Sequence, residues 1–148
     1  MPGPWDGAQI PADDKVAVAS RRIIVSALYD FAVEGGAVST IGLRGATDIP
    51  SGARCVGGYI DVLTTLTSGG AATIALQLEA AGDIVAATAV ASWTAGQKNI
   101  LPALTSGSVT AGTTVKTTAA RDISVVIAAF ALTAGKFRVV LEFEPVGI

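Results

Sequence analysis

The 148-residue chain contains no histidine and a single cysteine, Cys55. Without histidine there is no Ser–His or Cys–His dyad, no imidazole metal ligand and no side chain whose ordinary pKa lies near neutral pH. One cysteine cannot form a disulfide within the chain or supply a thiolate metal cluster. We therefore expect a protein that is not an enzyme, with no catalytic residue, no cofactor and no metal ligand.

Charged residues are also scarce, at 15% of the chain, and the formal net charge is −2. The basic residues are scattered and form no stripe for a phosphate backbone, so we expect no nucleic-acid partner. A soluble monomer usually carries more surface charge than this. The scarcity indicates that other protein covers much of the surface; an ordinary sandwich with a polar, threonine-rich surface is the alternative.

Long apolar runs are missing as well. The longest uncharged stretches, such as residues 62–78, are interrupted by glycine and are too short to span a bilayer. Residues 1–20 lack the basic start and apolar run of a signal peptide. We therefore expect no membrane partner and a protein made soluble in the cytoplasm of its host. Aromatic residues make up only 5% of the chain, so the core must consist of small side chains.

The pattern that is present is alternation with a period of two. Near the end of the chain Phe137, Val139, Leu141 and Phe143 occupy every second position, and polar or charged residues lie between most of them. This is the pattern of a half-buried β-strand. Similar runs occupy residues 22–31, 37–43, 59–67, 73–79 and 123–132.

Glycine-containing breaks separate some of these runs. They predict two hairpins, one between residues 59–67 and 73–79 and one in which the final two strands, before and after the break at residues 133–136, pair with each other. Residues 80–93 are ambiguous, because Asp83 could cap a helical turn through Ala87 while the same residues also alternate. We favour a short helical turn followed by a strand.

About seven to nine strands at regular spacing predict an all-β fold, a jelly-roll-like β-sandwich or barrel, formed by residues 21–148 as one domain. Residues 1–20 contain three prolines and are expected to form an extended N-terminal arm. Within this arm Trp5 and Ile10 offer apolar area to bury, either on their own domain or on a neighbour. Together with Trp93 they are the predicted partner-binding residues.

The carboxylates are the remaining chemical resource. Asp13 and Asp14 lie in the predicted arm, while Glu142 and Glu144 lie two apart on one strand face, which is typical of a solvated face and not of a catalytic acid–base pair. Cys55 follows Arg54 at the start of a strand and has no base beside it. We interpret it as a small buried apolar residue.

Several stretches resemble the small β-rich structural proteins of tailed-bacteriophage virions, above all capsid decoration (cement) proteins. The stretches are IPSGA at 49–53 leading into GYIDV at 58–62, AAGDIVAATAVASW at 80–93, and LTAGKF at 132–137. The resemblance covers residues 29–143. It implies a virion protein that binds the outer surface of an assembled capsid, bridges subunits of the major capsid protein and forms a homo-oligomer, with a trimer favoured.

Two alternatives stay open. Head-fibre, tail and baseplate components resemble the same stretches. A stand-alone carbohydrate-binding β-sandwich module is the alternative from another class, although its usual cluster of exposed aromatic residues is not evident, since Trp5, Trp93, Tyr29 and Tyr59 are widely separated in the sequence.

Overall fold

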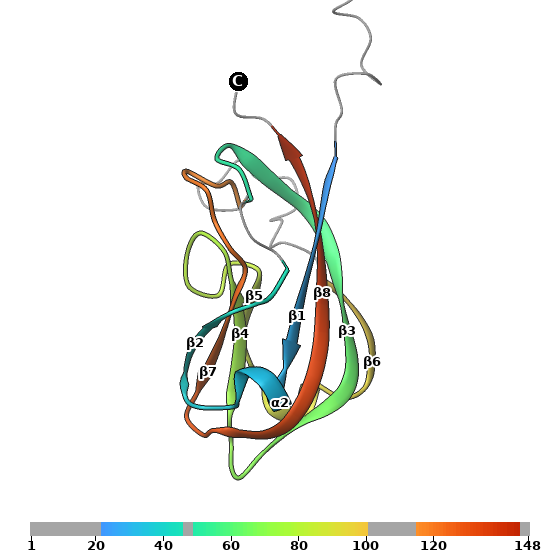
Figure 1. The fold of residues 1–148 in the computed structure, drawn as a ribbon, viewed down its shortest axis with the longest axis vertical. Helices are drawn as coiled ribbons and strands as arrows, with labels where there is room; N and C mark the ends of the chain where they lie inside the picture. Colours follow the sequence, from blue (N-terminus) through green and yellow to red (C-terminus); the bar gives the residue numbers. More distant parts are fainter. Residues whose placement is uncertain (1–21, 46–48, 101–114, 146–148) are drawn as a thin grey trace, which may run out of the picture.

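The computed structural model describes residues 22–45, 49–100 and 115–145, which form two four-stranded antiparallel sheets packed face to face (Figure 1). Sheet A has the order β1-β8-β3-β6, with β1 Ile23–Asp30, β3 Ala53–Ser68, β6 Gly96–Ile100 and β8 Leu132–Pro145. Sheet B has the order β2-β7-β4-β5, with β2 Ser39–Gly42, β4 Thr73–Gln77, β5 Val85–Ala89 and β7 Ser124–Ala128. A four-residue helix, α2 Phe31–Glu34, follows β1, and a 3-10 turn, η3 Val90–Ser92, follows β5.

This strand order is that of a jelly roll, in which two Greek keys form a double sheet. The predicted all-β sandwich is therefore confirmed. The predicted arm, residues 1–20, lies outside the described residues, so it stays a prediction.

Both predicted hairpins are wrong. β3 lies in sheet A and β4 in sheet B, and the same is true of β8 and β7, so neither pair shares a ladder. The chain crosses between the sheets at residues 69–72 and again at residues 129–131. These two crossings lie close together, because a Cβ on Gly70 would come within 2.7 Å of the Phe130 ring.

Gly135 explains why the second hairpin was misplaced. It lies inside β8 with φ +140°, where the ladder with β3 is irregular, and a Cβ there would come within 2.5 Å of the Leu66 side chain. Glycine is required at this position for close packing between neighbouring strands and not for a turn.

Residues 80–93 also differ from the prediction. Asp83 does not cap a helix; its carboxylate accepts the backbone N–H groups of Leu78, Glu79 and Ala80 at 2.8–2.9 Å and closes the turn between β4 and β5. The expected strand follows as β5, and the helical turn comes after it, as η3. β4 and β5 pair with each other.

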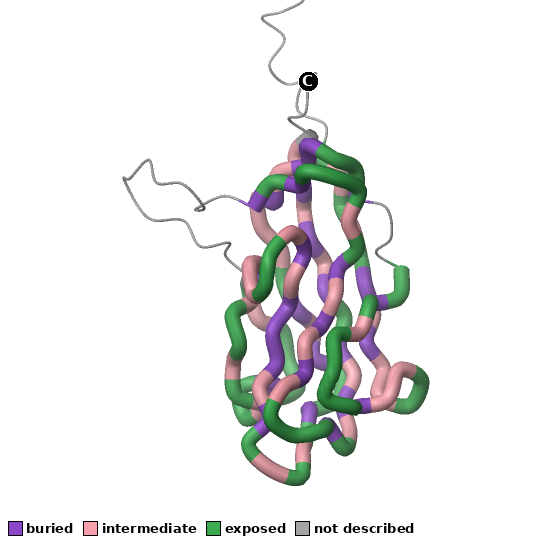
Figure 2. Tube along the Cα trace, turned by 90° about the vertical axis from the view of Figure 1, so that its left-hand side faces the viewer, coloured by how far each residue is buried: buried purple, intermediate pink, exposed green. Residues whose placement is uncertain are grey.

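The core fills the space between the two inner faces. Buried and less buried residues alternate along the strands (Figure 2), as the period of two predicted. In the centre the Phe137 ring stacks on Tyr29 and tilts against Trp93, each at 5.1 Å between ring centroids. The Tyr29 hydroxyl donates to the Gly35 carbonyl at 2.7 Å, and burial raises the pKa of this phenol to about 12.

The two long sides of the sandwich differ in whether a β-bridge links the two sheets. On the β1–β2 side an isolated bridge joins Leu28 to Arg44 through hydrogen bonds of 2.8 and 3.2 Å. On the β5–β6 side η3 and Trp93 carry the chain from one sheet to the other, but within the described residues no bridge joins β5 to β6. The β5–β6 side is therefore the more open one.

Candidate interaction surfaces

Charge is divided unequally between the two sheets. None of the four strands of sheet B contains a charged residue. The charged residues of the described strands all belong to sheet A: Asp30, Arg54, Asp61, Lys98, Lys136, Arg138, Glu142 and Glu144. The few charged residues of the described strands are therefore all in sheet A, and the strands of sheet B have none.

The outer face of sheet B consists of small, uncharged side chains. The strand register places Thr40, Val126 and Ala75 in one row across β2, β7 and β4. A second row joins Ala128, Thr73 and Ala89. Such a face can be covered by another protein without removing water from any charged group, which is the costly step in burying a surface.

The outer face of sheet A is a solvated, ion-paired surface. Arg22 lies 3.3 Å from Glu142, and Arg54 lies 2.9 Å from Glu144, with all four side chains partly exposed. The two glutamates thus hold separate ion pairs across the strands, in keeping with the predicted solvated face. Exposed pairs of this kind contribute little to stability.

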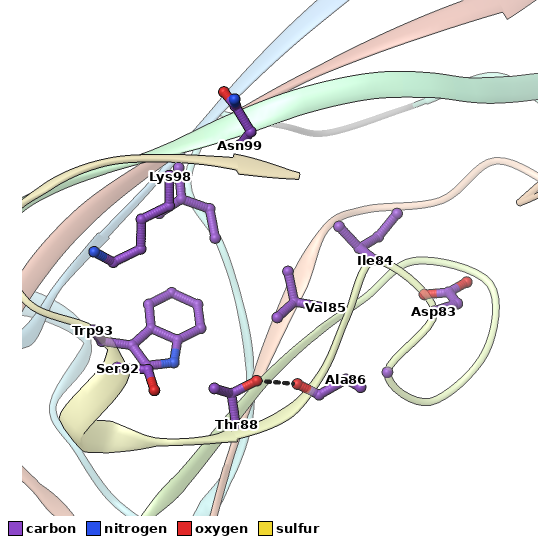
Figure 3. A pocket seen from close by; sticks show the side chains of 11 residues that line it. Asp83, Ile84, Val85, Ala86, Thr88, Ser92, Trp93, Lys98 and Asn99 are labelled. Atoms are coloured by element: carbon purple, nitrogen blue, oxygen red, sulfur yellow. Dashed lines mark hydrogen bonds between the residues drawn. The ribbon is translucent and has the colours of Figure 1, made fainter. Parts of the chain in front are cut away.

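A cavity of about 410 Å³ opens between the sheets on the β5–β6 side (Figure 3). Its apolar walls come from Ile60 of β3, from Ile84 and Val85, and from Trp93. Lys98 of β6 also lines it, because this residue pairs with Ile60 and therefore shares its inward direction. The cavity is mainly apolar. Lys98 adds an ammonium group, and Asp83, whose carboxylate accepts three backbone N–H groups, also lines it.

Trp93 lies in the core and not on the outer surface. It is only 3% exposed, packs against Phe137 and presents its remaining area to the cavity. None of the other side chains that line the cavity accepts a hydrogen bond from the Trp93 indole N–H (Figure 3). A partner can therefore reach Trp93 only through this cavity, and its role in binding stays a prediction, as do those of Trp5 and Ile10, which lie outside the described residues.

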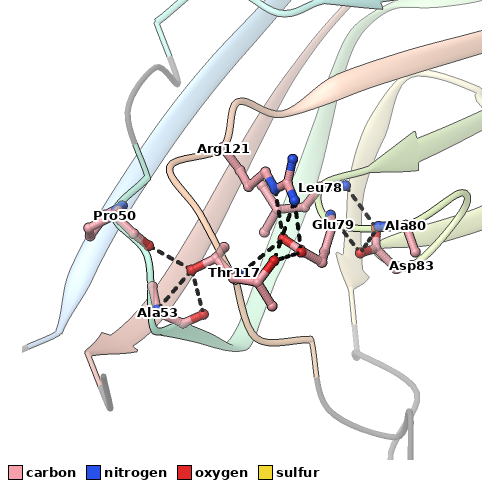
Figure 4. Close-up of polar contacts among 9 residues, drawn as sticks. Pro50, Ala53, Leu78, Glu79, Ala80, Asp83, Thr117 and Arg121 are labelled. Atoms are coloured by element: carbon pink, nitrogen blue, oxygen red, sulfur yellow. Dashed lines mark hydrogen bonds and ion pairs between the residues drawn. The ribbon is translucent and has the colours of Figure 1, made fainter. Parts of the chain in front are cut away.

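Polar side chains link neighbouring segments at one end of the sandwich (Figure 4). Arg121 donates two hydrogen bonds to the Glu79 carboxylate, at 2.8 and 2.9 Å, and Thr118 donates to the same group. Nearby, the buried Thr117 hydroxyl donates to the Pro50 carbonyl at 2.6 Å and accepts the Ala53 N–H at 2.9 Å. All of these polar groups are hydrogen-bonded within the fold.

The Glu79 contacts predict a pH dependence of stability. Hydrogen bonds from Arg121 and Thr118 lower the pKa of Glu79 from 4.5 to about 2. Because the folded-state pKa is the lower one, the stabilisation is present above pH 4.5 and is lost as the pH falls toward 2. We expect the melting temperature of the wild type to fall more steeply over this window than that of Glu79→Gln, with the two curves converging at the acidic end. Parallel curves would show that the Arg121 contact does not stabilise the fold.

Cys55 is buried, as predicted, and burial raises the pKa of its thiol. A raised pKa keeps the sulfur protonated and unreactive at neutral pH. In the part of the chain that the structure describes, no group of three or more His, Cys, Asp or Glu side chains could hold a metal ion. Within the same residues no helix has the length and hydrophobicity needed to span a bilayer.

Comparison with known proteins finds similarity in structure only. No protein-family model matches the chain, and no curated protein matches it. Two phage capsid structures contain chains with this fold. A chain of the cyanophage Pam1 capsid asymmetric unit superposes with a TM-score of 0.58 and 18% identity, over 97% of this chain and 99% of that one.

The second similar chain belongs to the acidic stable capsid structure of Helicobacter pylori bacteriophage KHP30. Its TM-score is 0.54 at 12% identity, over 85% of this chain and 89% of that one. At such low identities the likeness shows a shared fold.

Proposed function

We propose that this protein is a non-enzymatic virion structural protein that binds the outside of an assembled phage capsid and bridges its subunits. The support from fold comes from two capsid structures that contain chains with this architecture. The Pam1 match covers nearly the whole of both chains, so the likeness extends over an entire small protein and is not confined to one domain of a larger shell subunit.

The observation that carries the proposal is the uncharged outer face of sheet B. An enzyme or a carrier needs a few reactive or polar groups in a cleft, whereas a decoration protein needs contact area that it can bury cheaply. The occupant of this face is an uncharged surface of the major capsid protein. Because many copies bind one closed lattice and bind only its assembled form, modest interfaces stabilise the whole particle by mass action.

A carbohydrate-binding module receives less support. Trp93 and Tyr29 are buried, and among the described tryptophan and tyrosine residues only Tyr59 is exposed. A sugar-binding face normally presents several aromatic rings together. Fibre and tail roles share the fold argument and differ from decoration in copy number and position.

Capsids lacking this protein, compared with the same particles after it is added back, test the proposal. We expect the decorated particles to resist heating and chelators better, and we expect moderate salt not to release the protein, since its contact face is uncharged and only ionic contacts are screened. Equal resistance of the two preparations contradicts the proposal. A small fixed copy number at one vertex or on the tail indicates a fibre or tail component instead.

A further inference from the structure

The open β5–β6 side has the features of an acceptor for an added strand. β5, Val85–Ala89, pairs on one side with β4, and its sequence contains no charge and no proline. Natural proteins usually protect an edge strand with such residues, because its unpaired N–H and C=O groups otherwise bind another extended chain. In the described part of the chain, β5 is protected only by its short length and by the bulge in the β4–β5 ladder between Ile74 and Leu76.

The cavity beside this edge defines what an added strand must carry. Val85 and Thr88 of β5 line the cavity, so a strand added alongside β5 would direct every second side chain into the same space. Beside it lies Lys98, which has no ion-pair partner among the described carboxylates. The fitting occupant therefore has small apolar residues at alternate positions and a carboxylate close to one end.

The sequence of this protein contains such a segment. Residues 13–20 read DDKVAVAS, in which Val16 and Val18 are two apart and follow Asp13 and Asp14. We propose that residues 13–20 of one copy add as a strand to β5 of a second copy, with Val16 and Val18 in the cavity and the acidic pair beside Lys98.

Geometry favours a second copy over the same chain. β1 is the edge strand of sheet A opposite β6, about 14 Å away across three strand spacings. The five residues from Val18 to Ile23 extend about 17 Å at most. They cannot also pass around the sandwich to the other sheet. Repeated donation from one copy to the next is a head-to-tail interface, which closes into a ring where the rotation between copies allows it and would then give the homo-oligomer that the family resemblance implied. This inference does not depend on capsid binding.

A pair of matched double variants of the full-length chain tests it. Val16→Asp with Val18→Asp places two carboxylates in the cavity, and we expect association between copies to weaken by about 100-fold or more. Ala17→Asp with Ala19→Asp adds the same charge to the same segment on its opposite face and should leave association almost unchanged. Size-exclusion chromatography with light scattering measures the oligomer, and circular dichroism confirms that each variant is folded.

A charge exchange supplies a second readout. Lys98→Glu should weaken association between copies. Adding Asp13→Lys and Asp14→Lys to this variant should restore association, because the two sides of the ion pair have then exchanged their charges. The proposal is overturned if the wild type is monomeric at every concentration tested, if both double variants behave alike, or if the exchange restores nothing. The last two outcomes would be explained by residues 13–20 extending β1 within their own chain. All of these measurements are made without capsids, so a failure of capsid binding leaves them unaffected.

Discussion

Leu141→Asp is expected to yield no soluble folded protein. Leu141 is fully buried in β8, between Val25 of β1 and Gly58 of β3, and faces the core. Burying a carboxylate without a partner costs several kcal/mol, a large part of the roughly 5–15 kcal/mol that stabilises a domain. The substitution also loses the apolar contacts of the leucine. The measurement is the soluble yield together with circular dichroism and thermal unfolding.

Val140→Asp is the matched control. Val140 is the preceding residue of the same strand, pairs with Ser26 and Tyr59, and lies on the outer face of sheet A, where charged residues already occur. We expect this variant to fold with a small loss of stability. If Leu141→Asp folded as well as Val140→Asp, the register of β8 described here would be wrong.

The same strand shows how far the sequence could predict the fold. Alternation at residues 137–143 identified the inner face of β8 correctly, because an alternating strand must bury its apolar side whatever its neighbours are. Alternation carries no information about which strand pairs with it. Among the described strands only β4 and β5 are sequence neighbours within one sheet, and every other pair of consecutive described strands lies in opposite sheets. The glycine-containing breaks between consecutive strands therefore led to two wrong hairpin predictions.

The sequence did not reveal the β4–β5 hairpin, and the reason is local. Asp83 is a typical helix-capping residue, and the sequence around it favoured a helical turn. In the structure its carboxylate instead accepts three backbone N–H groups of the preceding residues. Only the folded backbone decides between these two uses of one side chain, because a carboxylate can accept backbone N–H groups in either arrangement.

The candidate surfaces were partly predictable. The scarcity of charge indicated coverage by protein, and the sequence STIG, TIALQ, VAATA and SVVIA of the four strands shows where charge is missing. What the sequence could not supply was the grouping of these strands into one sheet. The cavity depends even more on tertiary structure, since Ile60 and Lys98 meet Ile84 and Trp93 only after both sheets have packed.

Charge placed on the outer face of sheet B is expected to abolish capsid binding. Thr40 of β2 and Thr73 of β4 point outward on this face, since their strand neighbours Ile41 and Ile74 point inward toward the core. In Thr40→Lys with Thr73→Lys, docking would have to remove water from two ammonium groups that have no partner on an uncharged surface. We expect the affinity for capsids to fall by about 100-fold or more, with folding unchanged.

Tyr59→Lys with Gln97→Lys is the matched control for this prediction. Both residues lie on the outer face of sheet A, where Tyr59 pairs with Val140 and Gln97 pairs with Asp61. The control adds the same net charge to the same protein, so any general repulsion or attraction by the capsid affects both variants equally.

Binding is measured by co-sedimentation with particles that lack the protein. Loss of binding in the control alone would move the docking face to sheet A, and equal loss in both variants would mean that net charge, not the face of sheet B, governs attachment. The proposed face is supported only if the sheet B variant alone fails to bind, because only then does the effect follow the face whose described strands carry no charge.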